Sequence, residues 1–224
     1  MSTVKNAVIA VAGMGKRLGF GQPKCLVKVK GKSILEYQLE LLANVENVFL
    51  VVGFGEMDVM SFASKIRKDI IFVRNSNFQH TKTLGSFYCA AKIIEDSAIF
   101  MDGDMIIEPH SFSKFCDVAM RSFSDELTIA VSKRISDDPV YCDVKEEGYG
   151  KLKINAFSFE KKSPYEWANI FFMPANLIEN GNTHTFEYLE KFLPAKAAII
   201  DRLEIDTVAD LKIAENEINT FFEL

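Results

Sequence analysis

The stretch that decides the fold is residues 7–24, which read AVIAVAGMGKRLGFGQPK. It opens with six apolar residues in succession, the pattern of a strand that is buried on both faces of a parallel sheet. Gly13 follows this strand directly, and Gly15 comes two residues later. Glycine permits the sharp turn that brings backbone N–H groups close to an anionic ligand. The stretch therefore predicts a buried strand that leads into an anion-binding loop.

The same loop carries three cations, Lys16, Arg17 and Lys24. Together they would neutralise most of the charge of a triphosphate, which is about −4 near neutral pH. On these residues alone, a surface turn with incidental basic side chains explains the loop equally well. Two other phosphate-binding motifs do not fit. The Walker loop requires a Gly-Lys-[Ser/Thr] ending that the stretch lacks, and the dinucleotide fingerprint requires glycine where Leu18 stands.

Hydrophobic periodicity predicts alternating strands and helices along the first half of the chain. Apolar runs predict strands at 7–12, 48–52, 70–73 and 98–101, and helical spacing predicts helices at 34–42, 57–67 and 83–94. Ser33 and Glu36 form the capping box that starts the first of these helices. The alternation predicts an α/β fold of Rossmann-like type, in which three α/β/α layers are built on a mixed, mostly parallel sheet.

The second half of the chain continues the mixture of strands and helices. Helices are predicted at 111–123, at 185–193 and from 207 to the end, strands at 127–132 and 170–173, and two further strands within 141–157. No repeat, low-complexity tract or linker interrupts the 224 residues. We therefore expect a single domain over residues 1–224.

Composition limits the functions that remain. A net charge of −5 argues against a nucleic-acid-binding protein, whereas a single nucleotide needs only a few local cations. Four cysteines and three histidines are scattered without the spacing of a zinc site, which indicates reduced, partly buried thiols. No run approaches the ~20 apolar residues that span a bilayer, and the N-terminus does not have the pattern of a signal peptide. We expect a cytoplasmic protein with no membrane and no nucleic-acid partner.

Carboxylates gather at two points along the chain. Asp102 and Asp104 follow the predicted strand at 98–101, at the edge where ligands bind in an open α/β sheet. Their spacing lets both approach one hard cation such as Mg²⁺, although a strand-ending Asp-Gly turn explains them as well. Asp206 lies in the sequence Leu-Glu-Ile-Asp-Thr at 203–207. It is either a metal ligand or only the N-cap of the last helix.

The N-terminal motifs resemble the signature of the nucleotidyltransferase superfamily with the GT-A-like fold. Members of this family open with a strand, then Gly-x-Gly-x-Arg-[Leu/Met], Pro-Lys, Gly-Lys and a hydrophobic segment that ends in Glu-Tyr. This chain reads Ala12-Gly-Met-Gly-Lys-Arg-Leu18, Pro23-Lys24 and Gly31-Lys-Ser-Ile-Leu-Glu-Tyr37. It departs from many members at Val11-Ala12 and in the short spacer between its arginine and its lysine.

The resemblance implies the nucleotide-diphospho-sugar transferase fold, and it implies a role for particular residues. Lys24 and Arg17 match the catalytic cations, and Asp104 and Asp206 match the ligands of Mg²⁺. The implied nucleotide-binding residues are Ala12, Gly13, Gly15, Lys16, Arg17, Thr83, Gly85, Ser86 and Asp102. Thr83, Gly85 and Ser86 lie near the start of the helix predicted at 83–94. Free N–H groups and hydroxyls there can bind the edge of a pyrimidine base, although helix capping alone accounts for the hydroxyls.

An acceptor site is implied by the segment after residue 157. Lys161 matches the lysine that contacts the acceptor phosphate in sugar-phosphate members of the family, and Trp167 and Asn169 lie in the strand that follows. An aromatic wall at Trp167 would attract a quaternary ammonium group through cation–π interaction. The alternatives are a solvated lysine and ordinary core packing of the tryptophan.

The small size, the short loop, Ser86 and the Glu-Ile-Asp ending are most similar to CTP-dependent members, particularly the phosphocholine and phosphonate-type cytidylyltransferases of surface-polysaccharide pathways. The expected reaction transfers a nucleoside monophosphate from a triphosphate, with CTP favoured, to a phosphorylated small molecule such as phosphocholine, a phosphonate or a sugar or polyol phosphate. Pyrophosphate leaves. An acceptor phosphate is already ionised, so the reaction needs no general base, and catalysis reduces to positioning two anions and neutralising charge.

Three alternatives to this function stay open. The chain could be a sugar-1-phosphate nucleotidyltransferase that uses UTP, dTTP or GTP. It could be a GT-A glycosyltransferase, because Asp102-Gly-Asp104 is an acceptable DxD motif, or a nucleotide-binding protein that has lost turnover. The sequence also leaves open whether the protein forms a homodimer.

Overall fold

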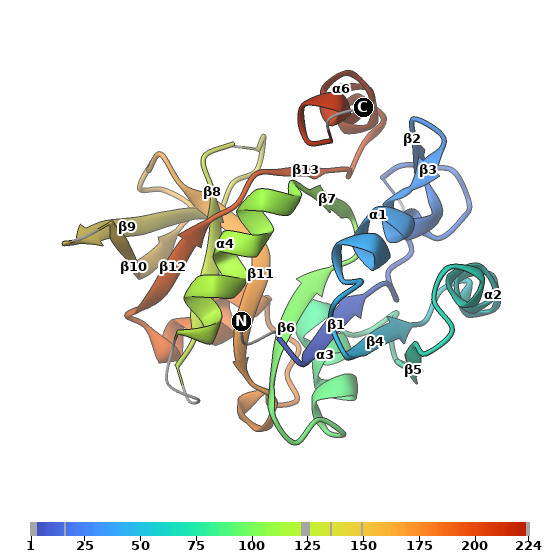
Figure 1. The fold of residues 1–224 in the computed structure, drawn as a ribbon, viewed down its shortest axis with the longest axis horizontal. Helices are drawn as coiled ribbons and strands as arrows, with labels where there is room; N and C mark the ends of the chain where they lie inside the picture. The colour runs from blue at the N-terminus through green and yellow to red at the C-terminus, as the bar shows by residue number, and fades with distance from the viewer. Residues whose placement is uncertain (1–3, 16, 122–125, 135, 149, 223–224) are drawn as a thin grey trace.

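The computed structural model describes residues 4–15, 17–121, 126–134, 136–148 and 150–222. Its centre is a nine-stranded sheet (Figure 1). In spatial order the strands are β5 (Ile71–Arg74), β4 (Asn47–Val52), β1 (Asn6–Ala10), β6 (Ser97–Asp102), β11 (Glu166–Pro174), β8 (Thr128–Ser132), β12 (Ala195–Ile199), β10 (Lys151–Ser158) and β9 (Tyr141–Glu147).

The pairing directions confirm a mixed, mostly parallel sheet. The first four strands in this order pair in parallel, and so do β8 and β12. Strand β11 is antiparallel to both of its neighbours β6 and β8, and β10 is antiparallel to both β12 and β9. All strands except β11 and β10 therefore run in the same direction.

Helices cover both faces of the sheet, as the three-layer prediction requires. Helices α1 (Ile34–Leu41), α2 (Glu56–Ile66) and α4 (Pro109–Met120) pack on one face, and α3 (Thr83–Ala91) and α5 (Thr185–Leu189) pack on the other. Successive side chains of a strand point to opposite faces, so Ile9 of β1 joins the first of these cores and Val8 joins the second. In Figure 1, α4 crosses in front of the sheet and α3 lies behind it.

Phenylalanines fill the core beneath α3. Phe100 of β6 stacks on Phe171 of β11 with ring centroids 5.0 Å apart. Phe87 of α3 meets both rings edge-on, at centroid distances of 5.4 and 5.6 Å. Each such pair contributes about 0.5–1.5 kcal/mol beyond the burial of its apolar surface. These contacts fasten α3 to β6, the strand that ends at Asp102.

Local signals in the sequence explain where several helices begin. The Ser33 hydroxyl accepts a hydrogen bond from the backbone N–H of Glu36 at 3.1 Å, so Ser33 caps α1 as predicted. Helix α4 begins earlier than predicted because Glu108 caps it and Pro109 occupies its first position. Helix α6 (Val208–Glu217) is capped by Thr207, whose hydroxyl accepts from the N–H of Asp210 at 3.2 Å.

Several elements differ from the predictions. Strand β12 was not predicted, because its sequence Ala-Lys-Ala-Ala-Ile has weak strand propensity outside the sheet that contains it. Strands β7 (Met105–Ile107) and β13 (Arg202–Glu204) were also missed, since three residues are too few to show a period. Between β1 and α1 the chain also forms a 3₁₀ turn at Lys24–Leu26 and the short hairpin of β2 (Lys28–Val29) and β3 (Lys32–Ser33).

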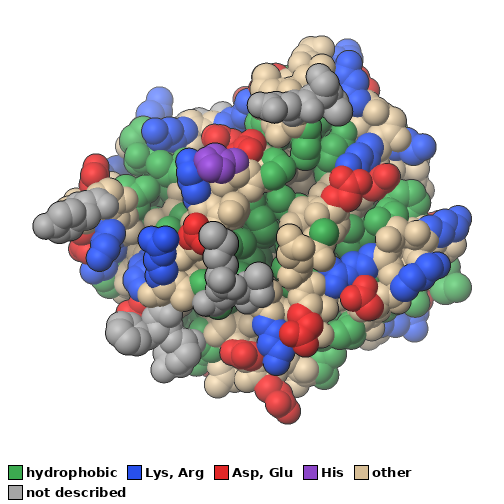
Figure 2. All heavy atoms as spheres, viewed as in Figure 1, with side chains coloured by type: hydrophobic (Ala, Val, Ile, Leu, Met, Phe, Trp, Pro, Cys, Tyr) green, Lys and Arg blue, Asp and Glu red, His purple; other side chains and the backbone are tan. Residues whose placement is uncertain are grey.

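Charged side chains of both signs lie on the surface. On the face seen in Figure 2, basic and acidic side chains are interspersed and not separated by sign. Among the described residues, no helix is long and apolar enough to cross a membrane.

Candidate active site

The short sheet of β7 and β13 brings the two predicted carboxylate segments together. The two strands pair antiparallel, with Met105 opposite Glu204. One residue further, the N–H of Ile205 donates to the carbonyl of Asp104 at 2.9 Å. The C-terminal carboxylates are thereby held beside the end of β6, at the carboxyl edge of the parallel strands. This is the edge where open α/β sheets bind their ligands.

Lys24 lies between the two predicted metal ligands. Its Nζ is 2.8 Å from Asp104 Oδ2 and also donates to Asp206 Oδ1. Arg17 Nη2 lies 2.8 Å from the other oxygen of Asp206. Three segments that are distant in sequence thus meet at one point. The side chain of Lys24 is 13% exposed and that of Arg17 is 69% exposed, so the lysine belongs to the floor of the site and the arginine to its rim.

The acidic surroundings determine the charge state of these groups. Burial lowers the pKa of Lys24, but the carboxylates of Asp104 and Asp206 raise it by more, so the pKa lies above its ordinary value of 10.5 and the ammonium stays charged. Burial raises the pKa of Asp102 well above its ordinary value, and the neighbouring Asp104 and Glu204 add to the rise. The protonated, neutral form of Asp102 is therefore favoured in the folded protein.

The carboxylates fit a divalent cation. Asp104, Glu204 and Asp206 each offer an oxygen, and these oxygens lie within 4.8 Å of one another. Asp104 Oδ1 is buried and has no hydrogen-bond partner among the residues that the structure describes. A buried, unpartnered carboxylate oxygen is costly unless a cation or donor meets it. An all-oxygen, carboxylate-rich set of ligands suits Mg²⁺.

A pocket of about 350 Å³ opens beside this cluster. Most of the predicted nucleotide-binding residues and all the predicted catalytic and metal-binding residues line it: Ala12, Gly13, Gly15, Arg17, Lys24, Thr83, Ser86, Asp102, Asp104 and Asp206. Helix α3 points its N-terminus at this pocket, and no side chain caps it, because Lys82 stands at the N-cap position. The N–H of Gly85 already donates to the carbonyl of Lys82 at 3.0 Å, so the described residues leave the N–H groups of Thr83 and Leu84 available to a ligand.

Close packing at two glycines shapes the floor of this pocket. Gly15 has φ +56°, and a Cβ added there would lie 2.9 Å from Cβ of Lys24. A Cβ added at Gly103 would lie 2.4 Å from Val11 Cγ1 and 2.7 Å from the carbonyl oxygen of Ala10. Glycine at these positions lets the loop and the end of β6 approach the lysine and the first strand. Gly103 thereby lets the Asp-Gly-Asp turn pack against the first strand.

A second pocket of about 420 Å³ adjoins the first. Arg17, Lys82, Thr83, Asp102 and Asp206 line both pockets, so the two form one cleft with the carboxylate cluster at their junction. The predicted acceptor residues Trp167 and Asn169 line the second pocket. Its aromatic wall also includes Phe186.

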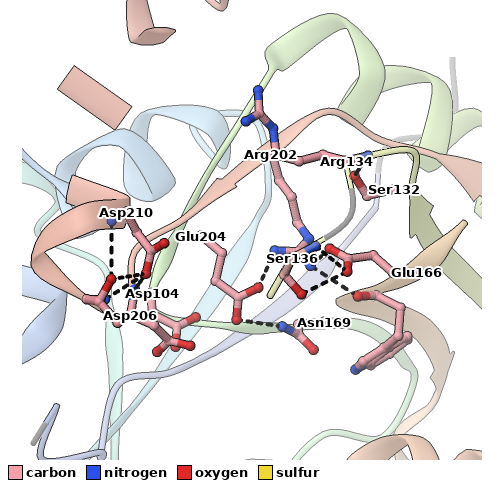
Figure 3. A network of polar contacts seen from close by, with 12 residues as sticks. Asp104, Ser132, Arg134, Ser136, Glu166, Asn169, Arg202, Glu204, Asp206 and Asp210 are labelled. Carbon is pink, nitrogen blue, oxygen red and sulfur yellow. Dashed lines mark hydrogen bonds and ion pairs between the residues drawn. The ribbon is translucent and has the colours of Figure 1, made fainter. Parts of the chain in front are cut away.

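A network of buried polar contacts forms part of the lining of the second pocket (Figure 3). Arg202 Nη2 is 2.8 Å from Glu166 Oε1, and Nη1 donates to Glu204 Oε2. Asn169 Nδ2 donates to the other oxygen of Glu204 at 3.2 Å. Figure 3 shows Glu204 between this network and the pair Asp104 and Asp206.

Three residues of this region were not among the predicted site residues. Glu204 had a signal in the sequence, because it alternates with buried Leu203 and Ile205 and shares the face of Asp206. Glu166 and Arg202 had none, since their ion pair joins segments that are 36 residues apart.

Other predicted residues lie apart from the pockets. Lys161 lines neither pocket and instead lies 3.7 Å from Asp143 in an exposed ion pair. Gly85 does not line the nucleotide-side pocket either, because it faces Thr81, to which an added Cβ would come within 2.8 Å. Lys16 lies outside the described residues. The cap of α6 is Thr207, so the alternative that Asp206 is merely the N-cap is wrong.

Two solved structures superpose on this chain over almost its whole length. The inositol-1-phosphate CTP transferase from T. maritima superposes with a TM-score of 0.78 at 20% identity and covers 97% of each chain. HddC from Yersinia pseudotuberculosis superposes with a TM-score of 0.73 at 20% identity, over 96% of this chain and 99% of its own. These similarities confirm the nucleotide-diphospho-sugar transferase fold.

Sequence comparison finds cytidylyltransferases among the relatives of this chain. The chain is 27% identical to the CTP:phosphoglutamine cytidylyltransferase of Campylobacter jejuni subsp. jejuni, over 97% of this chain and 86% of that protein. It is 36% identical to the 2-C-methyl-D-erythritol 4-phosphate cytidylyltransferase of Corynebacterium jeikeium, but over only 30% of this chain and 24% of that protein. The model of the MobA-like NTP transferase domain matches residues 7–146, which is 140 of the 224 residues. The chain therefore belongs to the MobA-like NTP transferase family.

Proposed function

We propose that this protein is a cytidylyltransferase, which transfers CMP from CTP to a phosphorylated small molecule and releases pyrophosphate. The observation that carries the proposal is the convergence of Lys24 with Asp104 and Asp206 at the junction of two pockets. One pocket offers a place for the triphosphate and the other a place for the acceptor. The reacting phosphates would then meet beside the lysine and the carboxylates.

In this reaction an oxygen of the acceptor phosphate attacks the α-phosphorus of CTP. The bond from the α-phosphorus to the bridging oxygen of the β-phosphate breaks, and pyrophosphate leaves with that oxygen. Lys24 is charged at all physiological pH values, so it neutralises the charge that grows on the phosphate oxygens. Arg17, on the exposed rim, reaches the β- and γ-phosphates as they depart. No side chain has to remove a proton from the acceptor.

A magnesium ion is part of the proposal. Asp104, Glu204 and Asp206 would hold it, because their oxygens lie close together and one of those of Asp104 is buried without a partner. When bound, Mg²⁺ supplies positive charge and fixes the orientation of the phosphate oxygens. Asp102 lines both pockets and is proposed to contact the nucleotide.

The base would lie against the N-terminus of α3. Asn75 donates hydrogen bonds to the hydroxyl oxygens of Thr81 and Ser86, at 2.9 and 3.0 Å, and thereby fixes both hydroxyls. Ser86 and Thr83 line the pocket. Fixed hydroxyls and free helix N–H groups suit the hydrogen-bonding edge of a pyrimidine. The preference for CTP over UTP, dTTP or GTP also agrees with the cytidylyltransferases among the relatives.

The acceptor would occupy the second pocket, between Trp167 and Asn169. Trp167 is only 6% exposed and packs edge-on against Phe157, so it forms a rigid wall of the pocket. Polar and charged residues line much of the remainder, among them Ser136, Asp137 and Asp138. This mixture suits an acceptor that carries polar or charged groups besides its phosphate. The phosphoglutamine used by the Campylobacter jejuni relative is one such molecule.

A matrix of substrates tests the proposal. CTP, UTP, dTTP and GTP are each combined with phosphoglutamine, phosphocholine, inositol 1-phosphate and glucose 1-phosphate, and pyrophosphate release is measured with Mg²⁺ and with a chelator. We expect release with CTP and at least one acceptor, and none with the chelator. Release with UTP, dTTP or GTP and a sugar phosphate would favour a sugar-1-phosphate nucleotidyltransferase. CTP binding without release from any pair would favour a protein that binds nucleotides and has no turnover.

A further inference from the structure

The buried ion pair between Arg202 and Glu166 links the carboxylate cluster to the wall of the second pocket. The proposed reaction gives this ion pair no role. The side chains of Arg202 and Glu166 are 3% and 2% exposed, and their closest N–O distance is 2.8 Å. Arg202 also donates to the carbonyl oxygen of Trp167 at 3.2 Å. A buried ion pair costs desolvation energy, so it is weak evidence for stability. Its position is the more informative property.

One end of this contact reaches the carboxylate cluster. Arg202 Nη1 donates to Glu204 Oε2, while Asn169 Nδ2 donates to Glu204 Oε1 at 3.2 Å. Each carboxylate oxygen of Glu204 therefore accepts a hydrogen bond that fixes its orientation. Arg202 is thus the cation that offsets the repulsion of Glu204 by its acidic neighbours.

The other end of the contact reaches the wall of the second pocket. Glu166 Oε2 accepts hydrogen bonds from both the backbone N–H and the hydroxyl of Ser136, each at 2.9 Å. Ser136 lines the second pocket together with Asp137 and Asp138. Glu166 therefore ties this segment of the pocket wall to Arg202 (Figure 3).

We propose that Arg202 is a positioning residue that acts at both ends of this network: it fixes Glu204 beside Asp104 and Asp206, and through Glu166 it fixes the Ser136 segment of the second pocket. The first half concerns the affinity for a divalent cation, and the second half concerns the affinity for the acceptor. Residues that orient a metal ligand from behind typically change metal affinity 10–100-fold, roughly, when they are removed. The second half rests on the proposed function, whereas the first half is independent of turnover.

A second arginine provides a matched control. Arg67 is also well buried, with a side chain that is 13% exposed. It donates to the carbonyl oxygens of Leu42 and Val45 at 2.9 and 2.6 Å and pairs with Asp69 at 2.8 Å. It lines neither pocket. Among the described residues, loss of Arg67 removes more hydrogen bonds than loss of Arg202, and none of them involves Asp104, Glu204 or Asp206.

The experiment measures Mn²⁺ binding by the EPR signal of the free ion, in the absence of nucleotide, for the wild type, Arg202→Met, Arg202→Lys, Asn169→Gly and Arg67→Met. Glycine is chosen at Asn169 because the backbone there has φ +58°, which glycine adopts without strain. We expect about tenfold or greater weakening of Mn²⁺ binding in Arg202→Met, a smaller loss in Arg202→Lys, which keeps the charge, and weakening in Asn169→Gly. Arg67→Met should lower the melting temperature and leave Mn²⁺ binding unchanged.

The acceptor KM is measured on the same variants with the best substrate pair. It should rise in Arg202→Met and stay unchanged in Arg67→Met. Mn²⁺ binding within about twofold of the wild type in a folded Arg202→Met overturns the proposal. If that variant does not fold, wild-type Mn²⁺ binding in both Arg202→Lys and Asn169→Gly overturns it instead. A wild-type protein that binds Mn²⁺ but releases no pyrophosphate contradicts the proposed function alone. One that releases pyrophosphate but binds no Mn²⁺ without nucleotide overturns this inference alone.

Discussion

Lys24 Nζ lies 2.8 Å from Asp104 Oδ2 across a separation of 80 residues in the sequence. The contact depends on three features of the fold. The loop after β1 folds back through the 3₁₀ turn at Lys24–Leu26, β6 runs parallel to β1, and Gly15 leaves room for the lysine stem. The ammonium is held among carboxylates before any phosphate arrives. A triphosphate with its own cation would exchange these partners, so the lysine is positioned in advance for the charge that it is proposed to neutralise.

Removal of either partner of this contact should slow turnover. We expect Lys24→Ala and Asp104→Ala each to lower kcat/KM at least tenfold, about 1.4 kcal/mol, because each removes a charge that the transition state requires. Lys32→Ala is the matched control, since Lys32 is also paired with a carboxylate, that of Glu40, but on the β3 side of the molecule. Steady-state pyrophosphate release measures all three. Near-wild-type rates in both site variants would contradict the proposed site.

Asp206 and Thr207 are neighbours with separable roles. Thr207 caps α6, and Asp210 accepts from the N–H of Thr207 at 2.7 Å in return. Asp206 instead faces Lys24 and Arg17. We expect Thr207→Ala to lower the free energy of unfolding by about 1 kcal/mol, the usual value of a helix cap. Asp206→Asn should lower turnover far more than Thr207→Ala does. Urea unfolding and pyrophosphate release distinguish the two, and the reverse ranking of activities would contradict the assignment of Asp206.

Much of this arrangement could be predicted from local patterns, and the rest could not for a physical reason. The strand and loop at 7–24 and the Asp-Gly-Asp turn after β6 each lie within a few residues, so spacing and the carboxyl-edge rule indicated them as candidate site segments, and the family resemblance supplied the expected roles. The pairing of β7 with β13 joins residues about a hundred apart in the sequence, and no local sequence pattern predicts it. Glu166 and Arg202 were missed on the same ground. Lys161 matched its motif, but the structure places it with Asp143, outside both pockets.

The cysteines predict a dependence of stability on pH. Burial raises the pKa of Cys25 and of Cys116 to about 12, from an ordinary value of 9.0, and it also raises the pKa of Cys142. Below pH 9.0 these thiols are neutral in both the folded and the unfolded protein. Above it, the unfolded chain loses protons first, so the free energy of unfolding falls as the pH rises from about 9 toward about 12.

Urea midpoints measured across this pH range check the sign of the effect, and Cys116→Ala, which removes one of the raised groups, should weaken the slope. A thiol reagent gives an independent measurement. At about pH 8 the native protein should react slowly, because the thiolate is the reactive form, and the unfolded protein should expose all four thiols. Rapid labelling of Cys25 or Cys116 in the native state would contradict the raised pKa values.

Two glycines of the nucleotide-side loop test whether the loop positions Lys24 or is merely a surface turn. Gly15 and Gly19 both have positive φ, +56° and +70°, so alanine strains the backbone at both positions. Only at Gly15 would the added Cβ meet another residue, at 2.9 Å from Cβ of Lys24, whereas the space at Gly19 is open. Gly15→Ala should therefore displace the lysine and lower kcat about tenfold or more, and Gly19→Ala should not. Because the backbone strain is similar in the two variants, the difference between their kcat values measures the effect of displacing the Lys24 ammonium. Equal effects of Gly15→Ala and Gly19→Ala on kcat would contradict this prediction. The loop would then matter for its flexibility alone, and the position of Lys24 would not affect turnover.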